Sequence, residues 1–145
     1  MNIAQKDFYQ KLRLNINKWI DTNVGKNHKW TEFILLAPDL FHLLCKLTID
    51  SDVPSSKKVK LGAVILYFIS PIDILPEAFL GPIGYLDDIS LAAYILNDLL
   101  LNVDPKIIRR NWAGESDVLD IIKTILVNFE NFLGKKLWSK IRKRF

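Results

Sequence analysis

The chain of 145 residues has the length of one domain, and half of its residues are hydrophobic. A domain of this length buries about two thirds of its unfolded surface, so a single core is enough. The mean hydropathy of +0.13 is high for a soluble protein but low for a protein with several membrane spans. The single cysteine, Cys45, excludes an intramolecular disulfide, and the polar residues after Met1 do not resemble a signal peptide. We therefore expect one domain that is cytosolic or faces the cytosol.

The positive charge of the chain is concentrated at its C-terminal end. The formal net charge is +4, but the last eleven residues contain six basic side chains and no acidic ones. The other 134 residues carry 14 basic minus 16 acidic side chains, a net charge of −2. A nucleic-acid-binding domain usually spreads its basic residues along a binding face, so we do not expect nucleic acid as a partner.

Two amphipathic helices are expected in the first third of the chain. In residues 2–23, apolar side chains recur every three or four positions, at Phe8, Leu12, Ile16 and Trp19 or Ile20. A second helix is expected from Pro38 to about Asp50, with a buried row made of Leu40, Leu43, Leu44 and Leu47. His42 and Cys45 share one face of this second helix. Two ligands do not make a zinc site, so we predict no metal there.

Two strongly apolar segments, 59–69 and 89–101, define a helical hairpin at residues 55–101. Residues 61–69 have no polar face, so we expect protein or lipid on every side of this helix. The apolar run is too short for a transmembrane helix, which needs about 17 to 25 residues. A buried core hairpin and a re-entrant or shallowly inserted hairpin are therefore both open.

Three lysines, Lys57, Lys58 and Lys60, crowd the first turn of the hairpin's first helix. Positive charge at this end opposes the helix dipole. An acidic partner or lipid headgroups would explain the cluster, and a solvated surface cluster is the alternative.

The connector of the hairpin contains four carboxylates, Asp73, Glu77, Asp87 and Asp88. Ser70 to Asp73 fits a capping box with Pro71 at the first helical position. Asp87 or Asp88 is expected to cap a helix that begins near Ile89. If the four carboxylates converge instead, they require Mg²⁺, Ca²⁺, a cationic partner or raised pKa values. Helix capping is thus one prediction, and an ion or partner site is the other.

The connector reads Ser70-Pro71-Ile72-Asp73-Ile74-Leu75-Pro76-Glu77, followed by Gly84-Tyr85-Leu86-Asp87-Asp88. This order resembles the hallmark of the YkvA-like family, a domain of unknown function common in bacteria, which is roughly Ser-Pro-x-Asp-x-x-Pro-Asp, a short apolar spacer and Gly-Tyr-x-Asp-Asp. The chain departs from that pattern in two places, because Glu77 replaces the usual Asp and Gly81-Pro82 interrupts the spacer. The resemblance implies a helical fold and association with a membrane, and it implies no established chemistry.

Two further helices are expected in the C-terminal third. Asp104-Pro105 is a strong start for a short helix that runs to about Trp112. Ser116 or Asp117 then opens a long final helix, whose apolar row consists of Val118, Ile122, Ile125 or Leu126, Phe129, Leu133, Leu137, Ile141 and Phe145.

The end of this helix, residues 135–145, combines the apolar row with the six basic side chains. This is the composition of an interfacial membrane helix, and each basic group near an anionic leaflet contributes about 1 kcal/mol. We predict membrane contact by Lys135, Lys136, Leu137, Trp138, Lys140, Ile141, Arg142, Lys143, Arg144 and Phe145. A helix that packs on the body with solvated charges is the alternative.

These patterns predict an all-α fold, a single compact domain of roughly five to seven helices built around the hairpin at 55–101. No Walker loop, nucleophile elbow or His-Glu-x-x-His motif occurs, so we expect a protein without catalytic residues, cofactor or metal. The predicted function is a membrane-associated binding or scaffolding module on the cytoplasmic side, peripheral or shallowly inserted. Its predicted partner is an anionic membrane surface, and a protein partner or a second copy of the chain is left open. The alternative is a soluble helical protein whose acidic turn binds a divalent cation or a basic protein partner.

Overall fold

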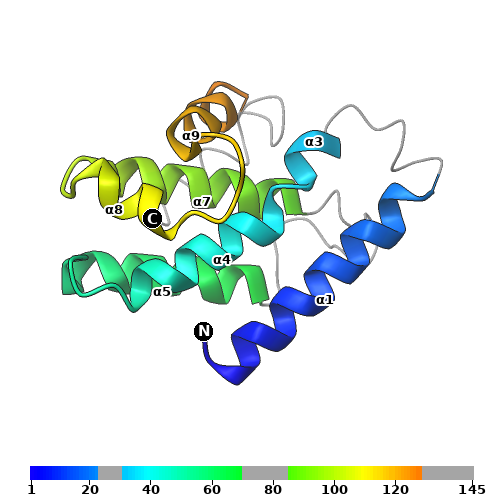
Figure 1. The fold of residues 1–145 in the computed structure, drawn as a ribbon, viewed down its shortest axis with the longest axis horizontal. Helices are drawn as coiled ribbons and strands as arrows, with labels where there is room; N and C mark the ends of the chain where they lie inside the picture. The colour runs from blue at the N-terminus through cyan, green and yellow to red at the C-terminus, as the bar shows by residue number, and fades with distance from the viewer. Residues whose placement is uncertain (23–30, 70–84, 129–145) are drawn as a thin grey trace.

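The computed structural model describes residues 1–22, 31–69 and 85–128, with the backbone alone for residues 85–87. Every regular element in these ranges is a helix, which confirms the predicted all-α class. Figure 1 shows the arrangement of these helices. Their bounds are α1 Ile3–Ile20, α3 Thr31–Ile34, α4 Ala37–Thr48, α5 Ser55–Ile69, α7 Tyr85–Leu100, α8 Pro105–Asn111 and α9 Val118–Val127.

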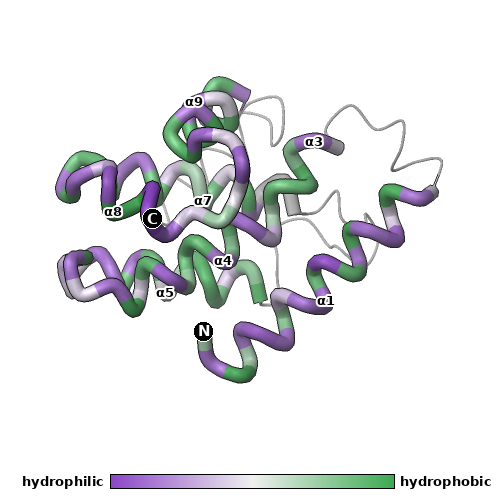
Figure 2. The backbone as a smooth tube through the Cα atoms, in the orientation of Figure 1, coloured by the Kyte–Doolittle hydropathy of each residue, from purple (hydrophilic) through white to green (hydrophobic). Residues whose placement is uncertain are grey.

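Helix α1 confirms the amphipathic pattern predicted for residues 2–23, although it ends earlier, at Ile20. A capping box fixes its start, because the Gln5 amide donates to Asn2 Oδ1 at 2.8 Å and the Asn2 amide donates to Gln5 Oε1 at 3.2 Å. Leu12 and Ile16 are buried. In Figure 2 the tube of α1 alternates between hydrophilic and hydrophobic residues, as expected for a helix with one side on the core.

Helix α4 lies in the middle of the bundle and packs against α1, α5, α7 and α8 (Figure 1). Pro38 stands in its first turn, as predicted, and the helix ends at Thr48. The Phe41 ring joins three helices, because its centroid lies 4.8 Å from that of Phe8 and 5.6 Å from that of Phe68. The predicted row is buried together with further residues of the same helix: Ala37, Pro38, Leu40, Phe41, Leu43, Leu44, Cys45 and Leu47.

Helices α5 and α7 pack against each other, and both contact α4. The two arms of the predicted hairpin are therefore neighbours in the core. The connection at residues 70–84 lies outside the described residues. Helix α7 buries apolar side chains around much of its circumference, namely Ile89, Leu91, Ala92, Ala93, Ile95, Leu96 and Leu99.

Protein covers α5 on one side only. Residues 61–69 were expected to be surrounded by protein or lipid on every side. Within the chain, Leu66 is 68% exposed and Ile69 is 38% exposed, so the covering of this exposed side by lipid or by a partner stays a prediction. The reason is that α4 and α7 cover only the side of α5 that carries Leu61, Val64 and Phe68. Apolar composition showed that the helix could be enclosed, but the number of neighbouring helices decides how much of it is enclosed.

The starts of α8 and α9 agree with the prediction. The Lys106 amide donates to Asp104 Oδ1 at 2.9 Å, and Pro105 follows at the first helical position. The Leu119 amide donates to Asp117 Oδ1 at 3.2 Å, so Asp117 caps α9. Val118, Ile122 and Ile125 are the buried residues of α9, which packs on α7. The predicted continuation of this apolar row beyond Asn128 lies outside the described residues.

Candidate functional site

The structure describes only part of the predicted carboxylate site. Asp73 and Glu77 lie outside the described residues, and the side chain of Asp87 is also not described. Asp88 is fully buried, and it and Ser90 are the two buried polar residues of the described part of the chain. The convergence of the four carboxylates therefore stays a prediction.

The start of α7 corrects the prediction for this region. A helix capped by Asp87 or Asp88 was expected near Ile89, but α7 begins at Tyr85, so both aspartates lie inside its first turn. Acidic residues in a first turn interact favourably with the helix dipole, which explains why the helix continues toward its N-terminus through them.

Two of the three clustered lysines have an acidic partner within the chain. Lys57 Nζ lies 3.2 Å and Lys60 Nζ 3.6 Å from the same oxygen of Asp98 on α7. Lys57 donates a hydrogen bond to this oxygen, and its side chain is only 20% exposed. Sequence reasoning missed Asp98 because it lies 41 positions from Lys57 and no local pattern connects them.

The side of α5 that faces away from the core forms an apolar surface. We call Val59, Gly62, Ala63 and Leu66 the outer face of α5. These residues line a groove of about 620 Å³ together with Lys58, with Gln5 of α1 and with Thr48 of α4. A Cβ placed on Gly62 would meet no atom within 4 Å, so the groove is open at this position. Val59 is 74% exposed.

His42 and Cys45 show no sign of a metal site. No three residues among His, Cys, Asp and Glu lie together as a metal site would require in the part of the chain that the structure describes. Burial raises the pKa of the Cys45 thiol to about 12, so the thiolate that binds metals is strongly disfavoured. Burial, assisted by Lys46, lowers the pKa of His42.

The residues predicted to contact a membrane, 135–145, lie outside the described residues. Their placement is therefore still a prediction. Along 1–22, 31–69 and 85–128, no helix is both long and apolar enough to cross a bilayer.

Comparisons with known proteins identify one domain. Residues 57–94 match the model of a family described as "Protein of unknown function (DUF1232)". The matched segment includes the outer face of α5, the lysine cluster and the acidic connector. Over 105 residues the chain is 27% identical to "Uncharacterized protein ORF9" of Methanothermobacter thermautotrophicus, an alignment that covers 71% of this chain and 72% of that protein. No solved structure matches significantly. Residues 57–94 of the chain are therefore similar to a domain of unknown function.

Proposed function

We propose that this protein is a non-enzymatic binding or scaffolding module that associates with the cytoplasmic side of an anionic membrane. The observation that carries the proposal is the outer face of α5, an exposed apolar row in the segment that matches the family model. The protein lies on the membrane or enters it shallowly.

The outer face of α5 has the composition of a membrane-contact surface. Val59 and Leu66 are 74% and 68% exposed, and each contributes about 2 kcal/mol when it is transferred from water into an apolar environment. Lys58 lines the same groove, and a lysine near anionic headgroups adds about 1 kcal/mol. A few residues of this kind give a reversible contact of modest affinity.

The basic C-terminal segment supports the same function from the sequence. Residues 135–145 carry six positive charges beside an apolar row. Stable anchoring of a protein to a membrane usually takes two weak signals, because one alone gives only marginal binding. The outer face of α5 and residues 135–145 are two such signals in one chain.

The domain of unknown function is, on this proposal, a YkvA-like domain. The support is the order of Ser, Pro, Asp, Gly and Tyr positions between Ser70 and Asp88. The resemblance implies membrane association, in agreement with the exposed face of α5.

Co-sedimentation of the full-length protein with vesicles tests the proposal. Binding to vesicles that contain phosphatidylserine is compared with binding to neutral vesicles, at low and high salt. The double variant Leu66→Gln/Val59→Gln removes the apolar contact, and a full-length variant with all six basic residues of 135–145 changed to Gln removes the electrostatic one. Leu101→Gln/Val127→Gln is the matched control, because these side chains are 80% and 82% exposed and lie outside α5.

We expect the α5 variant to lower the partition coefficient onto vesicles by up to about a thousandfold, since it loses two side chains that contribute about 2 kcal/mol each. The variant without basic residues should lose its dependence on salt and on phosphatidylserine. The control should bind as the parent protein does. If the parent protein binds neither kind of vesicle, the membrane function is wrong.

A second candidate function follows from the burial of Asp88. Asp88 belongs to the set of four carboxylates for which the sequence predicts a cation or partner site, and the structure buries it fully. In this alternative the protein is soluble, and its acidic turn binds a divalent cation or a basic protein partner. The effect of divalent ions on thermal stability separates the two functions.

A further inference from the structure

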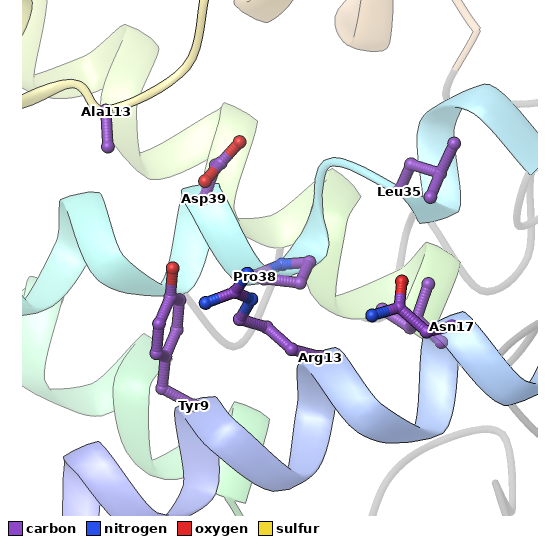
Figure 3. A pocket seen from close by; sticks show the side chains of 8 residues that line it. Tyr9, Arg13, Asn17, Leu35, Pro38, Asp39 and Ala113 are labelled. Carbon is purple, nitrogen blue, oxygen red and sulfur yellow. The ribbon is translucent and has the colours of Figure 1, made fainter.

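Three neighbouring cavities of the bundle share lining residues, and we treat them together as one groove. The first, of about 340 Å³, lies between α1 and the start of α4, with Tyr9, Arg13 and Asp39 in its lining (Figure 3). The second, of about 420 Å³, shares Leu35, Asp39 and Ala113 with the first. The third, of about 400 Å³, shares Leu36, Ser116 and Ile121 with the second. The groove therefore runs from α1, past α3 and the start of α4, to α9.

This surface, which we call the acidic groove, is lined by four carboxylates, those of Glu32, Asp39, Glu115 and Asp120. Among the described residues, none of the four forms an ion pair. Arg13 is the one basic residue in the described lining, and its guanidinium lies over the Tyr9 ring, 5.6 Å from the centroid. The described lining thus has an excess of negative charge.

The pKa of Asp39 agrees with this arrangement. Burial raises it, while His42 and then Arg13 act in the opposite direction. A cation placed in the groove would stabilise the charged form of this carboxylate.

The lining also contains apolar surface between the carboxylates. Leu35 is 43% exposed, and Phe33, Leu36, Trp112 and Ile121 are partly buried. A groove with apolar side chains and a negative rim fits a helix that has an apolar row flanked by basic residues.

The chain itself contains such a segment. Residues 135–145 have the apolar residues Leu137, Ile141 and Phe145 at intervals of four, with six basic side chains around them. As a helix, eleven residues are about 16 Å long. We propose that residues 135–145 bind in the acidic groove of the same chain, with their basic side chains against its carboxylates.

The connection between the two is short enough for this contact. Ile121 and Thr124 of α9 line one end of the groove, and α9 ends at Val127. The seven residues from 128 to 134 reach up to about 23 Å when extended. A linker of this length gives an effective concentration in the millimolar range, so even a weak contact is populated within one chain.

This docking does not depend on membrane binding. If the proposed function also holds, the same basic residues have two alternative sites, the groove and the anionic surface. The protein would then expose its basic segment most fully when a membrane is present.

Limited proteolysis of the full-length protein with trypsin tests the docking without any membrane. The measured quantity is the rate of cleavage after the basic residues of 135–144, followed by mass spectrometry of the intact chain. The groove variant is Glu32→Lys/Glu115→Lys, since both side chains are exposed. Asp7→Lys/Asp21→Lys, two exposed carboxylates of α1 and its C-terminal cap outside the groove, is the matched control. Circular dichroism establishes that each variant is folded.

We expect cleavage of the segment to be about fivefold faster in the groove variant, the change that two reversed surface charge contacts produce. High salt should accelerate cleavage of the parent protein, and the control should match the parent. Changing Lys140 and Lys143 to Glu in the groove variant should restore protection of the bonds after Lys135 and Lys136, two trypsin sites that this change leaves intact, because the two sets of charges are then exchanged. Equal cleavage rates in the parent and the groove variant would overturn the proposal. Protection that disappears on dilution would also overturn it, because the segment would then occupy the groove of a second copy.

Discussion

The guanidinium of Arg110 in α8 binds the carboxylate of Asp50, sixty positions earlier in the chain, through two hydrogen bonds of 2.7 and 3.1 Å. Asn111 Nδ2 donates to the same carboxylate at 2.8 Å, and Arg110 also donates to Asp52 at 2.6 Å. The Asp50 side chain is only 9% exposed, whereas Arg110 is 49% exposed. This bidentate contact fixes α8 to the turn that follows α4.

Replacing Arg110 should destabilise the fold. We expect Arg110→Ala to lower the free energy of unfolding by more than the loss of an ordinary surface ion pair, because it leaves a largely covered carboxylate without its charged partner. Urea denaturation measures this quantity. Arg109→Ala is the matched control, since Arg109 pairs with the more exposed Asp117 at 3.4 Å and should contribute less. Equal losses in the two variants would show that the Arg110 contact has no special role.

The same contact predicts a dependence of stability on pH. Hydrogen bonds from Arg110, and then from Asn111, hold the pKa of Asp50 well below its usual range. The stabilisation is therefore complete above the pKa of the unfolded state, about 3.9, and it is lost as the pH falls below that value. Urea denaturation between pH 6 and pH 2.5 should show a smaller loss for Asp50→Asn than for the parent protein. An equal loss of unfolding free energy in Asp50→Asn and in the parent protein over this pH range would contradict the prediction.

Phe41 is the core side chain whose loss should be most damaging. Its ring contacts Phe8 of α1 and Phe68 of α5 and is fully buried. We expect Phe41→Ala to lower the free energy of unfolding by about 3–5 kcal/mol, since it removes apolar contacts and leaves a cavity. Leu14→Ala, at a position that is 57% exposed, should change stability little. Thermal and urea unfolding of both variants provide the comparison.

Cys45 should not react with thiol reagents in the folded protein. The side chain is 1% exposed, and burial raises its pKa to about 12. The thiolate fraction at pH 8 is therefore very small. Treatment with a disulfide reagent at this pH should label the chain only after denaturation. Rapid labelling of the native protein would mean that α4 opens readily.

The ion hypothesis for Asp73, Glu77, Asp87 and Asp88 is tested by melting temperature. If the four carboxylates bind Mg²⁺ or Ca²⁺, millimolar divalent ion should raise the melting temperature of the parent protein relative to EDTA. Asp87→Ala should abolish this increase, and Asp7→Ala, at an exposed position outside the set, should leave it intact. If the melting temperature of the parent never responds to divalent ions, the ion hypothesis fails.

The features of the fold that the sequence predicts correctly are those that depend on residues close together in the chain. The apolar row of α1, Pro38 in the first turn of α4 and the Asp104-Pro105 start of α8 all depend on residues within one or two turns. The sequence does not predict the contacts between helices across the bundle. No local pattern connects Lys57 with Asp98, which are 41 positions apart, or Asp50 with Arg110, which are 60 positions apart.

The sites illustrate the same limit. The sequence does not show which side of α5 faces the core, because both sides consist of apolar residues. The acidic groove combines Arg13, Asp39 and Glu115 from three separate parts of the chain, so no motif marks it. Charge complementarity between the groove and residues 135–145 becomes visible only when those carboxylates are placed along one surface.

The contact of Lys57 and Lys60 with Asp98 has a consequence for the uniqueness of the fold. Because α5 is apolar on two sides, hydrophobic burial alone would allow the helix to rotate about its axis and pack with either side inward. Lys57 and Lys60 lie one turn apart on the same side, so they reach Asp98 in one rotational setting only. We therefore expect the ion pair to favour this orientation of α5 over the rotated one, which is a contribution to structural specificity.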